Sequence, residues 1–227
     1  MSDNKFSKGE AIRFGWDRMK DNLGFFIVYL IILFSVEFFF SAFAGLFEDS
    51  LPFLSLIFNV GLWIVNIISG IFNVKIGLRL YDNERIGSYG FLSFSSSLFF
   101  KFLLGYILYL IVVLIGLILL IVPGVYLAIK YQFVTYLIVD KGMGPIEAFK
   151  ESGKITAGSK WNLFLLIILL LIIVLLGLLA FIVGIFVALP IVMVAVAYVY
   201  RKLSSNTVIN SDIARSDNPF QPPAPIS

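Results

Sequence analysis

The chain has 227 residues, of which 60% are hydrophobic and 14% are charged, and its formal net charge is +3. Soluble domains are about 45–50% apolar, so this composition excludes an ordinary soluble domain. The chain contains no cysteine and no histidine, which excludes disulfide and thiolate chemistry and removes the commonest general base and zinc ligand. We expect an all-α integral membrane bundle of six transmembrane helices, arranged as three hairpins with interfacial amphipathic helices.

A polar segment opens the chain over residues 1–22. Within it Ile12, Trp16 and Met19 recur at helical spacing among charged residues, a pattern typical of a helix that lies at a membrane interface. We predict a cytoplasmic amphipathic leader in which Arg13 and Trp16 contact lipid headgroups. A solvated helical leader is the alternative interpretation.

The transmembrane domain is predicted to cover residues 23–202, and its first two spans lie at about 23–47 and 53–80. The first span contains Glu37. An ionisable group at membrane depth is costly and is a candidate functional residue.

Three asparagines recur every seven residues in the second span and line one helix face: Asn59, Asn66 and Asn73. Two interpretations of this stripe remain open. Amide side chains hydrogen-bond neighbouring helices within lipid, and they also line polar pathways through membrane bundles.

The third and fourth spans are predicted at about 102–122 and 124–140, with Pro123-Gly124 as the break between them. The fourth span is short and carries Lys130. Counted from the span ends, Glu37 and Lys130 lie at similar depth and have opposite charge. We hypothesise that they meet in an outer-facing polar cavity, with Asn59 nearby. The alternative is that Lys130 extends outward to the interface and that Glu37 reaches the outer interface.

A polar connector covers residues 141–160, and Pro145 suits the first turn of a helix there. Lys150 and Lys154 lie on its charged side and Trp161 follows it, so we expect all three to contact anionic lipid headgroups. Residues 86–100 are rich in aromatic residues and serine and form another candidate interfacial segment.

The fifth and sixth spans are predicted at about 162–180 and 182–201. The segment 203–227 is polar and ends in a proline-rich stretch, which indicates a disordered cytoplasmic tail. With six spans, all 17 lysines and arginines fall on one side or at its helix ends, except Lys130. The positive-inside rule then predicts a multi-pass membrane protein with both termini in the cytoplasm.

An internal repeat is suggested by three units of similar plan at residues 9–80, 86–140 and 145–202. The first and third units share a local motif, because Glu10-Ala11-Ile12-Arg13 resembles Glu147-Ala148-Phe149-Lys150. Triplicated hairpins occur in transport proteins, and they also arise as plain structural duplication.

Several motifs resemble those of a group of bacterial six-span membrane proteins: Pro123-Gly124, Lys130, Asp140, Glu147-Ala148, Ser152, Gly158, Trp161, Pro190 and Tyr200-Arg201-Lys202-Leu203, with Gly9-Glu10-Ala11, Gly15-Trp16 and Asn22 near the start. The group includes the YciC-like family and the membrane domain found attached to some glycerophosphoryl diester phosphodiesterases. The resemblance implies an inner-membrane protein, and the phosphodiesterase association suggests that it handles lipids or glycerophosphodiesters. The hydrolase chemistry is not carried over, because these residues contain no hydrolase domain.

Signatures of enzymes are missing, since no HExxH motif, paired-aspartate metal cluster or nucleophile elbow occurs. We therefore expect a non-catalytic protein without a metal, a cofactor or a nucleic-acid partner. The leading hypothesis is that it binds or moves a lipid or small amphiphile through Glu37, Asn59, Asn66 and Lys130. The alternative is an accessory membrane subunit that binds a partner protein through residues 141–160 and the proline-rich tail.

Overall fold

The computed structural model describes residues 6–84 and 95–216, with the side chains of 181–183 and 208–216 left outside this description. The described chain is helical, which confirms the predicted all-α class. Among these residues, six segments are long and apolar enough to cross a membrane. The helices are α1 (Lys8–Asp21), α2 (Leu23–Leu46), α3 (Pro52–Tyr81), α4 (Ser96–Leu119), α5 (Ile121–Tyr131), α6 (Val134–Lys141), α7 (Pro145–Ile155), α8 (Lys160–Leu179) and α9 (Phe181–Ser216).

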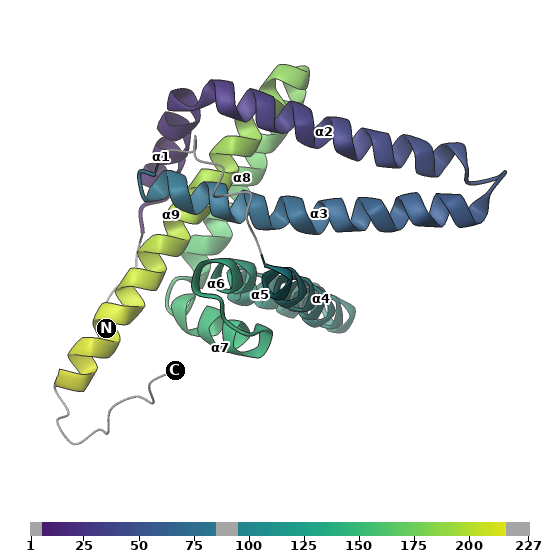
Figure 1. The fold of residues 1–227 in the computed structure, drawn as a ribbon. Helices are drawn as coiled ribbons and strands as arrows, with labels where there is room; N and C mark the ends of the chain where they lie inside the picture. Colours follow the sequence, from purple (N-terminus) through teal and green to yellow (C-terminus); the bar gives the residue numbers. More distant parts are fainter. Residues whose placement is uncertain (1–5, 85–94, 217–227) are drawn as a thin grey trace.

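The membrane-spanning helices pack in pairs that follow one another along the chain. Helix α2 packs against α3, α4 against α5, and α8 against α9. Figure 1 shows α2 and α3 lying side by side and projecting away from the rest of the molecule. The pairs meet near the ends of the spans that carry Arg79, Lys101, Lys141, Lys160 and Arg201, and we call these ends the basic end. Most of the predicted interfacial segment 86–100 lies outside the described residues.

The connection between α4 and α5 differs from the predicted break at Pro123-Gly124. The chain turns at Leu120, which has an extended backbone, and Pro123 lies in the first turn of α5. Proline is tolerated there because the first N–H groups of a helix have no helical partner. Gly124 instead permits close packing, since a β-carbon at this position would lie 2.7 Å from the main-chain nitrogen of Leu117 on α4.

The fourth span is interrupted, although the sequence predicts one continuous segment at 124–140. Helix α5 ends at Tyr131 and α6 begins at Val134. The interruption leaves the main-chain carbonyl of Lys130 without its usual helical partner. Two buried hydroxyl groups, Ser152 Oγ of α7 and Thr156 Oγ1 at its C-terminal cap, lie 3.0 and 3.1 Å from this carbonyl oxygen. The Thr156 hydroxyl also lies 2.8 Å from the Ser152 carbonyl oxygen. Irregular backbone in a membrane protein persists where such protein groups satisfy its hydrogen bonds.

Helix α9 continues to Ser216, well beyond the predicted end of the sixth span at residue 201, so residues 203–216 are helical where the sequence predicts a disordered tail. Leu203 is fully buried, and Thr207 Oγ1 donates a hydrogen bond to the Leu203 carbonyl. No glycine or proline occurs between Ile191 and Asn218, so nothing stops a helix whose preceding turns are packed. Residues 217–227 lie outside the described part of the chain.

The two amphipathic helices α1 and α7 each bury one face against the bundle. In α1 the buried residues are Ala11, Gly15 and Met19, and in α7 they are Ala148, Ser152 and Ile155. Gly15 lets α1 approach α9 closely, since a β-carbon there would lie 2.6 Å from the Ile191 carbonyl oxygen. The apolar side of α1 therefore covers α9, while Trp16 remains exposed on another side.

Candidate functional site

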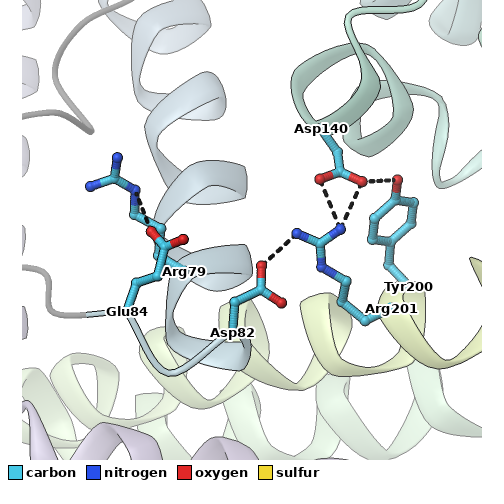
Figure 2. Close-up of polar contacts among 6 residues, drawn as sticks. All are labelled: Arg79, Asp82, Glu84, Asp140, Tyr200 and Arg201. Atoms are coloured by element: carbon cyan, nitrogen blue, oxygen red, sulfur yellow. Dashed lines mark hydrogen bonds and ion pairs between the residues drawn. The ribbon is translucent and has the colours of Figure 1, made fainter. Parts of the chain in front are cut away.

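A connected group of charged and polar side chains centres on Arg201 of α9 (Figure 2). Its Nη1 atom lies 2.8 Å from both carboxylate oxygens of Asp140, and its Nη2 atom lies 2.6 Å from Oδ2 of Asp82. The hydroxyl group of Tyr200 donates to Asp140 Oδ2 across 2.7 Å. We call these four residues the Arg201 cluster.

The Arg201 cluster joins one helix from each hairpin. Asp82 caps the C-terminal end of α3, Asp140 lies near the end of α6, and Tyr200 and Arg201 belong to α9. The Asp140 side chain is only 13% exposed and Tyr200 is fully buried. Partial burial strengthens such ion pairs, because the surrounding protein screens charge less than water does. The cluster therefore links the three hairpins through charged groups that bind one another, and the buried Arg201 Nε atom has no hydrogen-bond partner among the described residues.

Sequence reasoning missed this cluster. Asp82 and Glu84 are close in sequence but have different partners, because Asp82 binds Arg201 and Glu84 lies 3.5 Å from Arg79 at the more exposed edge. The feature that could have indicated the cluster is Tyr200-Arg201 at the end of an apolar span. The acidic partners of Arg201 lie more than 60 positions away along the chain. Local patterns carry no information on such pairs.

Glu37 and Asn66, both predicted as ligand-binding residues, share one hollow between α2 and α3. This hollow has a volume of about 500 Å³, and its lining residues are Phe34, Glu37, Phe38, Ser41, Leu62 and Asn66. Asn66 and Leu62 also line a second hollow, of about 390 Å³, towards Phe102 and Tyr106 of α4. We call the two together the Asn66 hollow. Among the described ion pairs, none involves Glu37.

The asparagine stripe of α3 has mixed roles. Asn73 accepts a hydrogen bond from the Tyr29 hydroxyl of α2 across 2.6 Å, so it links two helices. Asn59 and Asn66 donate to main-chain carbonyls one turn earlier in their own helix, those of Ser55 and Leu62. Asn59 does not line the Asn66 hollow.

Lys130 does not meet Glu37, so the hypothesis that the two pair in one outer-facing cavity is not supported by the geometry. The Lys130 ammonium lies 4.9 Å from the centre of the Tyr131 ring, and its side chain packs beside Gly153 of α7. It thus extends towards α7 at the basic end, not outward as the alternative interpretation expected. The reason is the break after Tyr131, which lets α7 approach this part of α5.

The five predicted headgroup residues lie on the surface of α1, α7 and the start of α8. Trp16 is 45% exposed with the Lys20 ammonium 5.6 Å from its ring centre, and Trp161 is 69% exposed. The three basic residues Arg13, Lys150 and Lys154 have exposed side chains. Their contact with lipid stays a prediction.

Among the residues whose side chains the structure describes, no group of three or more Asp and Glu side chains is placed to hold a metal ion. The fold and these sites together define a multi-pass membrane protein built from helical hairpins. Comparison with protein-family models, with curated proteins and with solved structures gives no match for this chain.

Proposed function

We propose that this protein is a non-catalytic membrane component that binds or moves a lipid or small amphiphile in the Asn66 hollow. The observation that carries the proposal is the meeting of Glu37 from α2 and Asn66 from α3 in one hollow of about 500 Å³. A carboxylate at membrane depth is costly unless a proton or a cation balances its charge. No described lysine or arginine supplies that cation.

The polar atoms of the hollow favour a ligand that donates hydrogen bonds. One N–H of the Asn66 amide donates to the Leu62 carbonyl, and the Asn66 side-chain oxygen and the Glu37 carboxylate are acceptors among the lining residues. The rings of Phe34 and Phe38 line the same space, and aromatic faces attract cations. An amphiphile with an ammonium head and an apolar chain fits these acceptors and this apolar lining.

We also propose that the basic end faces the cytoplasm of a bacterial cell, since the lysines and arginines gather there. The resemblance to the YciC-like group supports the same placement and the handling of lipid-like molecules. On this orientation the Asn66 hollow lies within the membrane, on the side of the Arg201 cluster that is further from the cytoplasm.

A titration with three ligands that share one chain tests this function: decylammonium, decyl sulfate and decanol, added to the protein in lipid nanodiscs. We expect decylammonium to bind best, and Glu37→Gln to weaken it about tenfold, which corresponds to about 1.4 kcal/mol. Asn66→Leu is expected to weaken it as well. Isothermal titration calorimetry gives the dissociation constants, with empty nanodiscs subtracted.

Asn59→Leu is the matched control, because Asn59 lies one heptad away on α3 and outside the Asn66 hollow. Its affinity should equal that of the wild type. Binding of none of the three ligands above the empty nanodiscs would overturn the proposal. In that case the preferred interpretation is an accessory membrane subunit that binds a partner protein through residues 141–160.

A further inference from the structure

Two lysines approach one tyrosine where α5, α7 and α8 meet at the basic end. Lys160 opens α8, and its Nζ atom lies 2.6 Å from the Tyr126 hydroxyl oxygen and 4.5 Å from the ring centre. Lys130 lies one helical turn after Tyr126 on α5, so both side chains leave the same face of that helix.

The Lys130 and Lys160 ammonium groups and the Tyr126 hydroxyl group each have a hydrogen-bond donor available for a further partner. An ammonium group is a donor only, so the Tyr126 oxygen accepts from Lys160 and keeps its own proton for a third group. Among the described residues, no carboxylate forms an ion pair with Lys130 or Lys160. Glu151 of the nearby α7 is engaged by Lys154 at 3.0 Å.

The position therefore has an excess of positive charge and lacks an acceptor. Lys130 and Lys160 carry like charges on either side of Tyr126, and an anion that accepts hydrogen bonds from both offsets the repulsion between them. The tetrahedral oxygens of a phosphate accept from several donors at once and carry the required charge.

The surroundings place this position at the depth of lipid headgroups. Trp161 follows Lys160 directly, is 69% exposed and stacks on Phe164, and exposed tryptophan beside lysine is typical of the membrane–water interface. Tyr126 is itself exposed on the outer surface of α5. A lipid beside α5 and α8 thus reaches all three donors without entering the bundle.

We infer that Lys130, Tyr126 and Lys160 form a binding site for a phosphate-bearing anion, with the headgroup of an anionic phospholipid as its occupant. This site is separate from the Asn66 hollow and does not depend on the function proposed for it. It also gives Lys130, the one lysine within a predicted span interior, a chemical reason for its position.

The test measures phosphatidylglycerol retained by the protein after extraction from nanodiscs of phosphatidylcholine with a minor fraction of phosphatidylglycerol. Native mass spectrometry counts the bound lipids. We expect Lys130→Met and Lys160→Met each to lower retention about fivefold, as the loss of one lysine–anion contact at a membrane surface predicts. Lys130→Arg, which keeps the charge, should retain most of the lipid and shows that loss in Lys130→Met is not misfolding.

Lys141→Met is the matched control, because Lys141 is an exposed lysine at the basic end that lies outside the site. Retention unchanged in both site variants, or lowered equally in Lys141→Met, would overturn the inference. Added inorganic phosphate identifies the source of the anion. Displacement of the lipid by millimolar phosphate points to a free-phosphate site, and resistance to it points to the phospholipid.

Discussion

Replacing Arg201 by methionine is expected to destabilise the protein by about 2–4 kcal/mol, because it leaves two carboxylates without their shared cation. Asp140 contributes most of this destabilisation, because its side chain is 13% exposed and both of its oxygens bind the guanidinium group. Asp82 is more exposed and contributes less. The free energy of unfolding in mixed micelles, followed by circular dichroism, measures this loss.

The matched control is Arg79→Met, which removes an arginine of the same charge from the same end of the bundle. Arg79 lies 3.5 Å from Glu84, whose side chain is 58% exposed, and exposed pairs contribute at most about 1 kcal/mol. Arg201→Lys should recover only part of the stability, because a single ammonium lacks the planar fork that reaches both carboxylates. Equal losses in the free energy of unfolding for Arg201→Met and Arg79→Met would contradict the role of the Arg201 cluster in holding the hairpins together.

The double substitution Ser152→Ala with Thr156→Val is expected to cost about 2–3 kcal/mol, the second large effect, because it leaves the Lys130 carbonyl unpaired inside the protein. Both hydroxyls are fully buried and both lie within hydrogen-bond distance of this carbonyl. Each single substitution leaves one donor in place and should cost less than about 1 kcal/mol. The double-mutant cycle is therefore strongly non-additive.

Unfolding measured in the same micelles gives the coupling free energy between Ser152 and Thr156. Ser205→Ala is the control, because its hydroxyl donates to the Lys202 carbonyl on an exposed turn of α9. That substitution should leave stability unchanged. Additive costs for Ser152 and Thr156 would show that the two hydroxyls do not share the carbonyl of the broken span.

The membrane helices could be predicted because their signal is local. Uninterrupted apolar runs of about 20 residues have few alternatives to helices in lipid. The shared hollow of Glu37 and Asn66 does not follow from such a local count, because Glu37 lies nine residues before the end of α2 at Leu46 and Asn66 lies fourteen residues after the start of α3 at Pro52.

The break in the fourth span could not be predicted, because Tyr131-Gln132-Phe133 contains neither glycine nor proline. Tertiary contacts stabilise it, through the hydroxyls of α7 that take up the freed carbonyl. The depth count for Lys130 assumed an isolated straight helix and therefore placed this lysine with Glu37. The Arg201 cluster was missed for a related reason, since its members come from three hairpins.

Helices α1 and α7, which carry the motif shared by the first and third units of the suggested repeat, place corresponding residues in similar positions. Glu10 and Glu147 each lie in the first turn of their helices, and Ala11 and Ala148 are both fully buried. Four residues later, Gly15 contacts the carbonyl region of Ile191 and Ser152 binds the carbonyl of Lys130. The duplication itself stays a prediction, which an alignment of α1–α3 onto α7–α9 by backbone superposition would examine.

The central claim, that an amphiphile occupies the Asn66 hollow, is tested most directly by photo-crosslinking. The probe is an alkylamine with a diazirine in its chain, and mass spectrometry maps the labelled peptides. We predict labels concentrated on residues 34–41 of α2 and 62–70 of α3, largely lost in Glu37→Gln and retained in Asn59→Leu. Labels spread evenly over all lipid-facing helices, with no effect of Glu37→Gln, would contradict the claim.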